Sequence, residues 1–102
     1  MKSYRLTTEA QDDLQEIGDY IAVNASLTRA LSVVSTIRAE FLKIGENPGI
    51  GHFKEDVVGK ELKFWSIYKY LIAYRWEQNP VEVVAVVHGN RDLAALFESR
   101  GY

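Results

Sequence analysis

The pattern of apolar and polar positions predicts a strand at the start of the chain. Over residues 2–7, Tyr4 and Leu6 alternate with Ser3 and Arg5, which is the two-residue period of a half-buried strand. Thr8 and Gln11 match a capping box, in which both side chains satisfy free backbone groups at a helix start, so a helix is expected to begin there.

Two amphipathic helices follow, joined by the short break at 24–26. Apolar residues recur at helical spacing in each of them. They are Ala10, Leu14, Ile17 and Ile21 in the first, and Ala30, Val33, Val34, Ile37, Phe41 and Ile44 in the second. Gly45 and the Asn47-Pro48-Gly49 sequence supply stop signals. The acids of the first helix (Glu9, Asp12, Asp13, Glu16 and Asp19) are expected on its solvated face.

Beyond a glycine-rich loop over 50–60, the period changes to that of strands at 61–67, 68–76 and 81–88. Arg91 to Phe97 has the composition of a short helix. The predicted fold class is therefore α+β, with one strand, a helical hairpin, a three-stranded antiparallel sheet and a short C-terminal helix. A single domain over residues 1–102 is expected, because a chain of this length can bury one core.

Composition narrows the functional classes. Twelve basic and fourteen acidic residues give a formal net charge of −2, so strong, direct nucleic-acid binding is not expected. No apolar run approaches the roughly 20 residues that span a bilayer, and no secretory signal is evident, so a soluble, cytoplasmic protein without membrane contact is predicted. With no cysteine and two histidines, neither a metal site nor a cofactor is expected.

A polar cluster, His88-Gly89-Asn90-Arg91-Asp92, follows the last predicted strand. Loops at strand ends can present side chains without disturbing the core, so this is the first place to expect function. His88 has an intrinsic pKa suited to acid-base work. Alternatively, His88 bonds to backbone, and Arg91 pairs with or caps the start of the helix beside Asp92.

Almost the whole chain resembles the ParE/RelE superfamily of toxins from type II toxin-antitoxin systems, and it is closer to ParE. The resemblance is carried by the order and spacing of short segments: 4–10 followed by 13–14 and 17–21, then 47–49, 61–63, 70–75 and 84–93. It implies a helical hairpin packed across a small sheet, a ParD-like antitoxin that forms a hetero-oligomer with the toxin, and poisoning of an essential target.

Members similar to RelE cut messenger RNA on the ribosome, whereas those similar to ParE are associated with inhibition of DNA gyrase. Where the family usually has a strand arginine, this chain has Lys63, and Phe97 stands where a RelE-like tyrosine is expected. A phenyl ring has no hydroxyl. If the chain were a ribonuclease, the catalytic candidates would be Lys63, Arg75, His88 and Arg91, with Tyr102 as a further proton acceptor if the tail folds back.

The resemblance therefore favours a non-catalytic toxin that inhibits gyrase and is neutralised by its antitoxin, with Lys63 and Arg91 as target-binding residues. A RelE-like ribonuclease and a degenerate member that only binds antitoxin remain the alternatives. Both faces of the predicted sheet are apolar and the hairpin can cover only one, so the second face is expected to be an antitoxin groove. The predicted antitoxin-binding residues are aromatic: Trp65, Tyr68, Tyr70, Tyr74 and Trp76.

Overall fold

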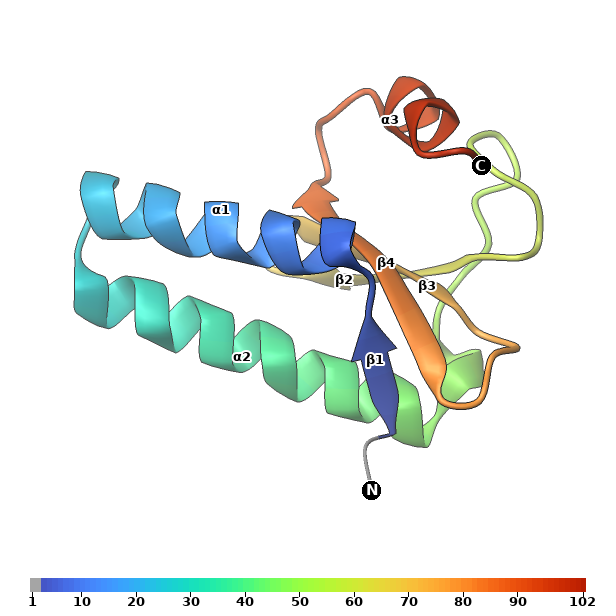
Figure 1. Cartoon of the computed structure of the whole chain (residues 1–102), viewed down its shortest axis with the longest axis horizontal. Helices are drawn as coiled ribbons and strands as arrows, with labels where there is room; N and C mark the ends of the chain where they lie inside the picture. Colours follow the sequence, from blue (N-terminus) through green and yellow to red (C-terminus); the bar gives the residue numbers. More distant parts are fainter. Residues whose placement is uncertain (1–2) are drawn as a thin grey trace.

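The computed structural model describes residues 3–102, and Met1 and Lys2 lie outside the described residues. A helical hairpin packs across one face of a single sheet, and a short helix lies near the end of the chain (Figure 1). The elements are β1 (Tyr4–Leu6), α1 (Thr8–Asn24), α2 (Leu27–Glu46), a 3-10 turn (Pro48–Ile50), β2 (Lys63–Ile67), β3 (Tyr70–Arg75), β4 (Val81–His88) and α3 (Leu93–Ser99). The predicted α+β class and order of elements are confirmed.

The four strands are ordered β1-β4-β3-β2. The antiparallel pairing of β2, β3 and β4 is as predicted, and β1 joins the same sheet in parallel with β4. The β3–β4 ladder shifts register between Ala73 and Tyr74, which pair with Ala85 and Val83. Val84 is therefore an extra residue on β4, as in a β-bulge.

α1 begins at Thr8 as predicted, but its cap is Thr7 rather than Thr8, and the start of α3 was predicted two residues too early. Thr7 caps α1: its hydroxyl accepts a hydrogen bond from the Ala10 amide at 3.1 Å, while its own N–H still bonds to Val83 of the sheet. Asp92 caps α3 through the Ala95 amide at 3.1 Å, so the helix begins at Leu93 rather than Arg91. In each case the cap is the last extended residue before the helix.

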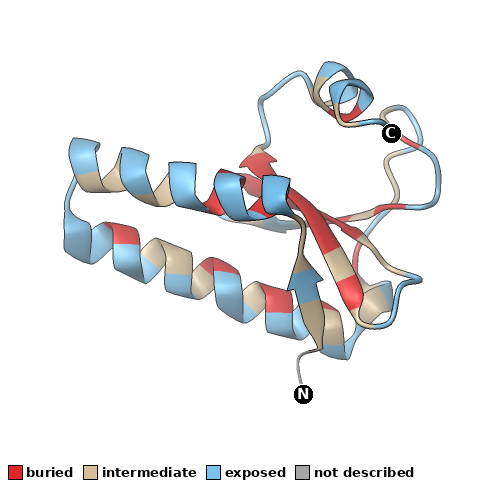
Figure 2. Cartoon of the chain, viewed as in Figure 1, coloured by how far each residue is buried: buried red, intermediate tan, exposed pale blue. Residues whose placement is uncertain are grey.

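The hairpin face of the sheet carries the larger core. Buried side chains from α1 and α2 meet the apolar alternation of β3 and β4, and Figure 2 shows burial concentrated where the helices cross the sheet. This core contains Ala10, Leu14, Ile37, Phe41, Ile44, Tyr70, Ile72, Tyr74, Val81, Val83 and Val86. The far end of the hairpin extends past the sheet and is mostly exposed.

The second face of the sheet is covered by the chain itself, so the prediction of an open antitoxin groove there is wrong. Phe97 of α3 is 0% exposed and packs edge-on to Phe64 with ring centroids 5.5 Å apart. This second core contains Val58, Leu62, Phe64, Leu71, Ala73, Val84, Ala85, Val87 and Phe97. The seven-residue helix α3 and the loop before β2 cover this face of the sheet, which the sequence pattern did not predict.

Candidate functional site

Side chains predicted to act together lie at opposite ends of the sheet. Lys63 of β2 is paired with Tyr74 of β3, which lies beside the first residues of β4. His88 is the last residue of β4 and is paired with Tyr70, at the other end of β3. Tyr70 and Tyr74 are four positions apart along β3, which corresponds to about 13 Å. The four ribonuclease candidates are therefore divided between the two ends of the sheet, with Lys63 and Arg75 at one end and His88 and Arg91 at the other.

The Lys63 ammonium is enclosed by its own chain. It donates to the carbonyl oxygens of Gly51 at 3.3 Å and Gly49 at 3.5 Å. It also lies 4.3 Å from the ring centroid of Phe53 and 5.0 Å from that of Trp76. Cation–π and carbonyl contacts of this kind hold the 49–53 segment against β2. Lys63 thus has a structural role that the sequence did not indicate.

The Arg75 guanidinium is also bound by groups of its own chain. Its Nε lies 3.3 Å from a Glu82 carboxylate oxygen, and Arg5 lies 3.2 Å from the other oxygen of the same carboxylate. Arg75 donates to the Tyr102 hydroxyl at 3.2 Å and stacks on that ring at 5.1 Å. The tail therefore does fold back, but it brings Tyr102 to Arg75 and not to His88.

The segment after β4 presents one exposed basic side chain. His88 accepts a hydrogen bond from the Asn90 amide through Nδ1 at 3.3 Å and packs edge-on to Tyr70 at 6.0 Å. Asp92 caps α3, whereas the exposed Arg91 forms no salt bridge within residues 3–102. The structural alternative for His88 fits these contacts, and Arg91 is left available to a partner.

The five predicted antitoxin-binding aromatics occupy different environments. Tyr74 is 0% exposed and is fixed by two hydrogen bonds, donating to the Pro48 carbonyl at 2.6 Å and accepting from the Gly51 amide at 3.0 Å. Trp65 and Trp76 are half-buried and donate to Glu40 and to the Lys60 carbonyl. Tyr70 is also buried, whereas Tyr68 is 64% exposed. Of the five, Tyr68 presents the most surface to a partner.

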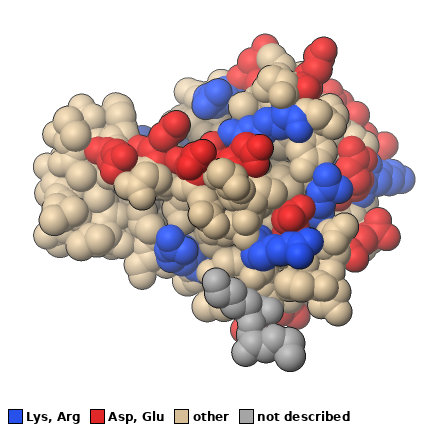
Figure 3. Space-filling model, viewed as in Figure 1, with Lys and Arg blue, Asp and Glu red and all other residues tan. Residues whose placement is uncertain are grey.

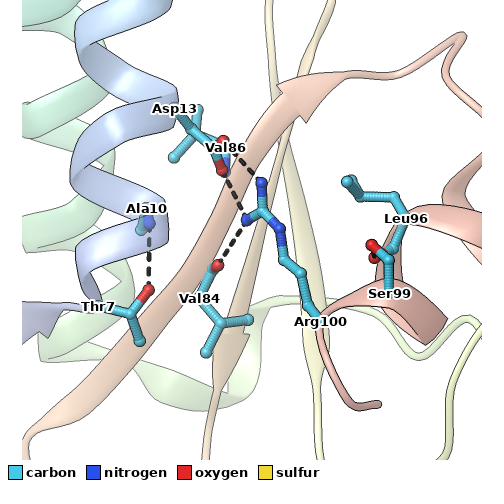
Figure 4. A network of polar contacts seen from close by, with 8 residues as sticks. All are labelled: Thr7, Ala10, Asp13, Val84, Val86, Leu96, Ser99 and Arg100. Carbon is cyan, nitrogen blue, oxygen red and sulfur yellow. Dashed lines mark hydrogen bonds and ion pairs between the residues drawn. The ribbon is translucent and has the colours of Figure 1, made fainter.

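A buried ion pair that the sequence did not predict joins α1 to the end of α3. Both oxygens of Asp13 on α1 accept from Arg100, at 2.7 and 2.9 Å, and Asp13 also accepts the Val86 amide at 3.0 Å. Arg100 donates further to the Val84 carbonyl at 3.0 Å. Figure 4 shows Arg100 reaching from the end of α3 across β4 to Asp13.

The Asp13–Arg100 pair bonds to backbone groups of β4 that have no neighbouring strand. β1 pairs with β4 only from Val81 to Val83, so the Val84 carbonyl and the Val86 amide lie beyond its end. A buried backbone group without a partner is costly, and the two side chains supply the missing partners. The hydrogen bond to Asp13 raises the pKa of Arg100 above its ordinary value, although burial opposes this rise.

The prediction that all acids of the first helix are solvated is wrong for Asp13, which is buried. It is only 9% exposed, whereas its neighbours Glu9, Asp12 and Glu16 are exposed. Figure 3 shows a row of acidic side chains on one face of the molecule. The available signal for Asp13 was its position three residues after Ala10 and four before Ile17, within the apolar stripe. Its partner, 87 residues away, gave no such signal.

The geometry defines a small α+β domain in which a helical hairpin crosses a mostly antiparallel sheet and the predicted catalytic residues are dispersed. Residues 4–93 match the family model described as the ParE toxin of the type II toxin-antitoxin system, parDE. The chain therefore belongs to the ParE toxin family.

A solved structure agrees on the fold. A chain from the chromosomal ParDE toxin-antitoxin system of P. aeruginosa superposes with a TM-score of 0.73 at 20% sequence identity, covering 86% of this chain and 96% of that one. No curated protein sequence matches the chain. Within residues 3–102, no helix is long and apolar enough to cross a membrane, and no group of three potential metal ligands is present.

Proposed function

We propose that this protein is a toxin that inhibits DNA gyrase and is neutralised by a cognate antitoxin. The observation that carries the proposal is the match to the ParE toxin family over residues 4–93. The action on gyrase is what the resemblance to ParE implies. The arrangement of the polar residues supports that branch of the superfamily over the ribonuclease branch.

Cleavage of RNA through its 2′-hydroxyl needs a proton acceptor and cationic groups around one phosphate. In this chain His88 is at one end of the sheet, whereas Lys63 and Arg75 are at the other and are engaged by carbonyl, aromatic and carboxylate groups. Phe97, at the position of the RelE-like tyrosine, is buried in the second core. These placements favour a toxin that acts by binding its target over one that cleaves RNA.

Arg91 is the proposed contact with the target. It is exposed beside the cap of α3 and forms no salt bridge within the described part of the chain. Lys63, the other predicted target contact, would act indirectly by shaping the 49–53 segment. Arginine is enriched among residues that dominate protein interfaces, which suits this role.

The test compares two targets with one preparation of the toxin. Gyrase supercoiling of relaxed plasmid is measured beside translation of a defined messenger RNA on purified ribosomes. We expect loss of supercoiling with translation intact, and Arg91→Ala should weaken the inhibition at least about tenfold. Arg38→Ala, an exposed arginine on α2 that forms no salt bridge within residues 3–102, is the matched control.

Cleavage of the messenger RNA with normal supercoiling would establish the ribonuclease alternative and overturn the proposal. If expression caused no growth arrest and neither assay responded, the chain would be an antitoxin-binding member without toxicity.

A further inference from the structure

A cleft of about 510 Å³ lies between the far half of the helical hairpin and the turn that joins β2 to β3. Both helices and the turn contribute to its walls. It is lined by Tyr20 and Ile21 of α1, by Arg29, Ser32 and Val33 of α2, and by Tyr68, Lys69 and Tyr70. We refer to these eight residues as the turn cleft.

The turn cleft combines an apolar surface with positive charge. Ile21 and Val33 are half-buried, and Tyr70 is buried, so they supply the apolar part. Arg29 and Lys69 are exposed, and neither forms a salt bridge within residues 3–102. No acidic residue of the described chain lines the cleft. The complementary ligand therefore carries carboxylates next to apolar side chains.

The tyrosine hydroxyls add hydrogen-bond donors for such a ligand. The Tyr70 hydroxyl is protonated at neutral pH, as in any ordinary tyrosine, and burial together with the nearby Tyr20 raises its pKa further. Tyr20 and Tyr68 are 66% and 64% exposed, which leaves large aromatic surfaces without a partner. Tyrosine at such positions is typical of protein interfaces, because the ring is apolar and the hydroxyl is polar.

Tyr68 is held in an unfavourable backbone conformation. Its φ of 54° is the single positive value among the non-glycine residues of the described chain, in a region that favours glycine or asparagine. The Gly89 amide bonds to the Lys69 carbonyl at 2.9 Å and fixes the turn. Since the Tyr68 side chain is largely exposed, packing does not account for a tyrosine here.

A second groove between the helices, on the side of Leu27 and Leu31, is less selective. Its walls carry both Asp19 and Arg38, so it favours neither sign of charge. The turn cleft is the better candidate for a charged partner. Figure 3 shows that the free end of the hairpin, in this view, carries few charged side chains.

We propose that the turn cleft binds a segment of the antitoxin in which one or two carboxylates flank apolar side chains. This inference rests on the proposed function and gives it a location. Arg29 and Lys69 pair with the carboxylates, while Tyr20 and Tyr68 cover the apolar side chains. It replaces the open sheet face predicted from the sequence with the space beside the β2–β3 turn.

The test uses the full chain and the protein encoded by the reading frame that adjoins its gene, with affinity measured by calorimetry. Tyr68→Gly removes the ring and relieves the backbone, so it should leave thermal stability unchanged or higher while weakening the complex at least about tenfold. Lys69→Glu and Arg29→Glu should weaken binding and its dependence on salt. Arg38→Glu changes another exposed arginine of α2, outside the turn cleft, and is the control that should bind normally.

If the Tyr68→Gly and Lys69→Glu variants bound the antitoxin with unchanged affinity, the turn cleft would not be its binding site. Gyrase inhibition by the same preparations would still support the proposed function. Loss of gyrase inhibition with normal antitoxin binding would assign the cleft to the target and overturn the inference. If Tyr68→Gly instead abolished self-association in sedimentation, a second copy of the chain would be the occupant. Failure of the unaltered chain to bind the adjoining gene product or to inhibit gyrase would contradict the proposed function.

Discussion

At the residue scale, the Asp13–Arg100 pair supplies hydrogen-bond partners to β4 that a longer β1 would otherwise supply. The side chains of Asp13 and Arg100 are 10% and 17% exposed, so their attraction is screened less than that of a surface pair. The pair joins α1, β4 and the end of α3 in one place. The pair stabilises the fold because, without it, the Val84 carbonyl and the Val86 amide would be left without hydrogen-bond partners.

Arg100→Ala should lower the free energy of unfolding by about 3 kcal/mol, because it leaves a buried carboxylate and the Val84 carbonyl without their partner. Urea unfolding measures this, and the double variant with Asp13→Ala should cost less than the sum of the single changes. Lys60→Ala, which breaks the exposed pair with Glu55, should change stability by less than about 1 kcal/mol. Equal costs for Arg100→Ala and Lys60→Ala would contradict this account.

Tyr74 gives the chain a dependence on alkaline pH. Burial raises its pKa above the ordinary 10.0, while the bond from the Gly51 amide opposes the rise. The folded chain then keeps the phenol proton to higher pH than the unfolded chain. This contribution to stability is therefore fully present below pH 10.0 and is lost as pH rises through the folded value.

Tyr74→Phe should make unfolding less sensitive to pH above 10.0 and should cost about 1 to 2 kcal/mol at neutral pH, because the Gly51 amide and the Pro48 carbonyl lose a partner. Stability followed by urea unfolding between pH 7 and 11 tests both parts. Tyr4→Phe is a control for the loss of a hydroxyl. An identical alkaline slope in the Tyr74→Phe variant would refute the assignment.

At the element scale, α3 and the preceding loop close the face of the sheet that the hairpin leaves open. α3 has only seven residues, so its own helical propensity cannot keep it in place. Phe97, inserted against Phe64, and the Arg100 contact hold it on the sheet. The short helix is thus a structural cover, and its stability is that of its contacts.

Phe97→Ala should lower the free energy of unfolding by about 3 to 5 kcal/mol, because it empties a site that is 0% exposed. Leu96→Ala, on the half-buried side of the same helix, is the control and should cost clearly less. Circular dichroism during urea unfolding gives both values. A loss at Phe97 as small as that at Leu96 would mean that α3 covers the sheet loosely.

Most elements could be predicted because their signals are local. The alternation in 70–76 and the four- and three-residue spacing in 10–21 depend on neighbours along the chain, and both are found as expected. The bulge near Val84, the cover formed by Phe97 and the partner of Asp13 depend on residues far away in the sequence. Nothing in the sequence indicated that Lys63 would be enclosed or that the site candidates would be divided between two ends.

At the scale of the whole molecule, two cores share one sheet. The residues of β3 and β4 alternate between them, so Tyr74 faces the hairpin core and Ala73 faces the α3 core. Neither core can lose its packing without exposing the opposite face of the same strands. Cooperative unfolding of a single unit is the expected consequence.

Phe41→Ala in the hairpin core and Phe97→Ala in the α3 core should each lower the midpoint of one and the same unfolding transition. Fluorescence of Trp65 and Trp76 and circular dichroism should report coincident curves in both variants. Separate transitions, or a variant in which only one probe shifts, would show that the two faces unfold independently.

The brevity of β1 has a consequence for how the protein behaves at high concentration. An uncovered strand edge is a template on which other chains can add strands and start aggregation. Beyond Val83, side chains take the place of a neighbouring strand on the β4 edge, because Arg100 bonds to the Val84 carbonyl and Asp13 to the Val86 amide. Any change that frees the last few residues of the chain would uncover this edge, and its first visible effect would be loss of solubility during expression.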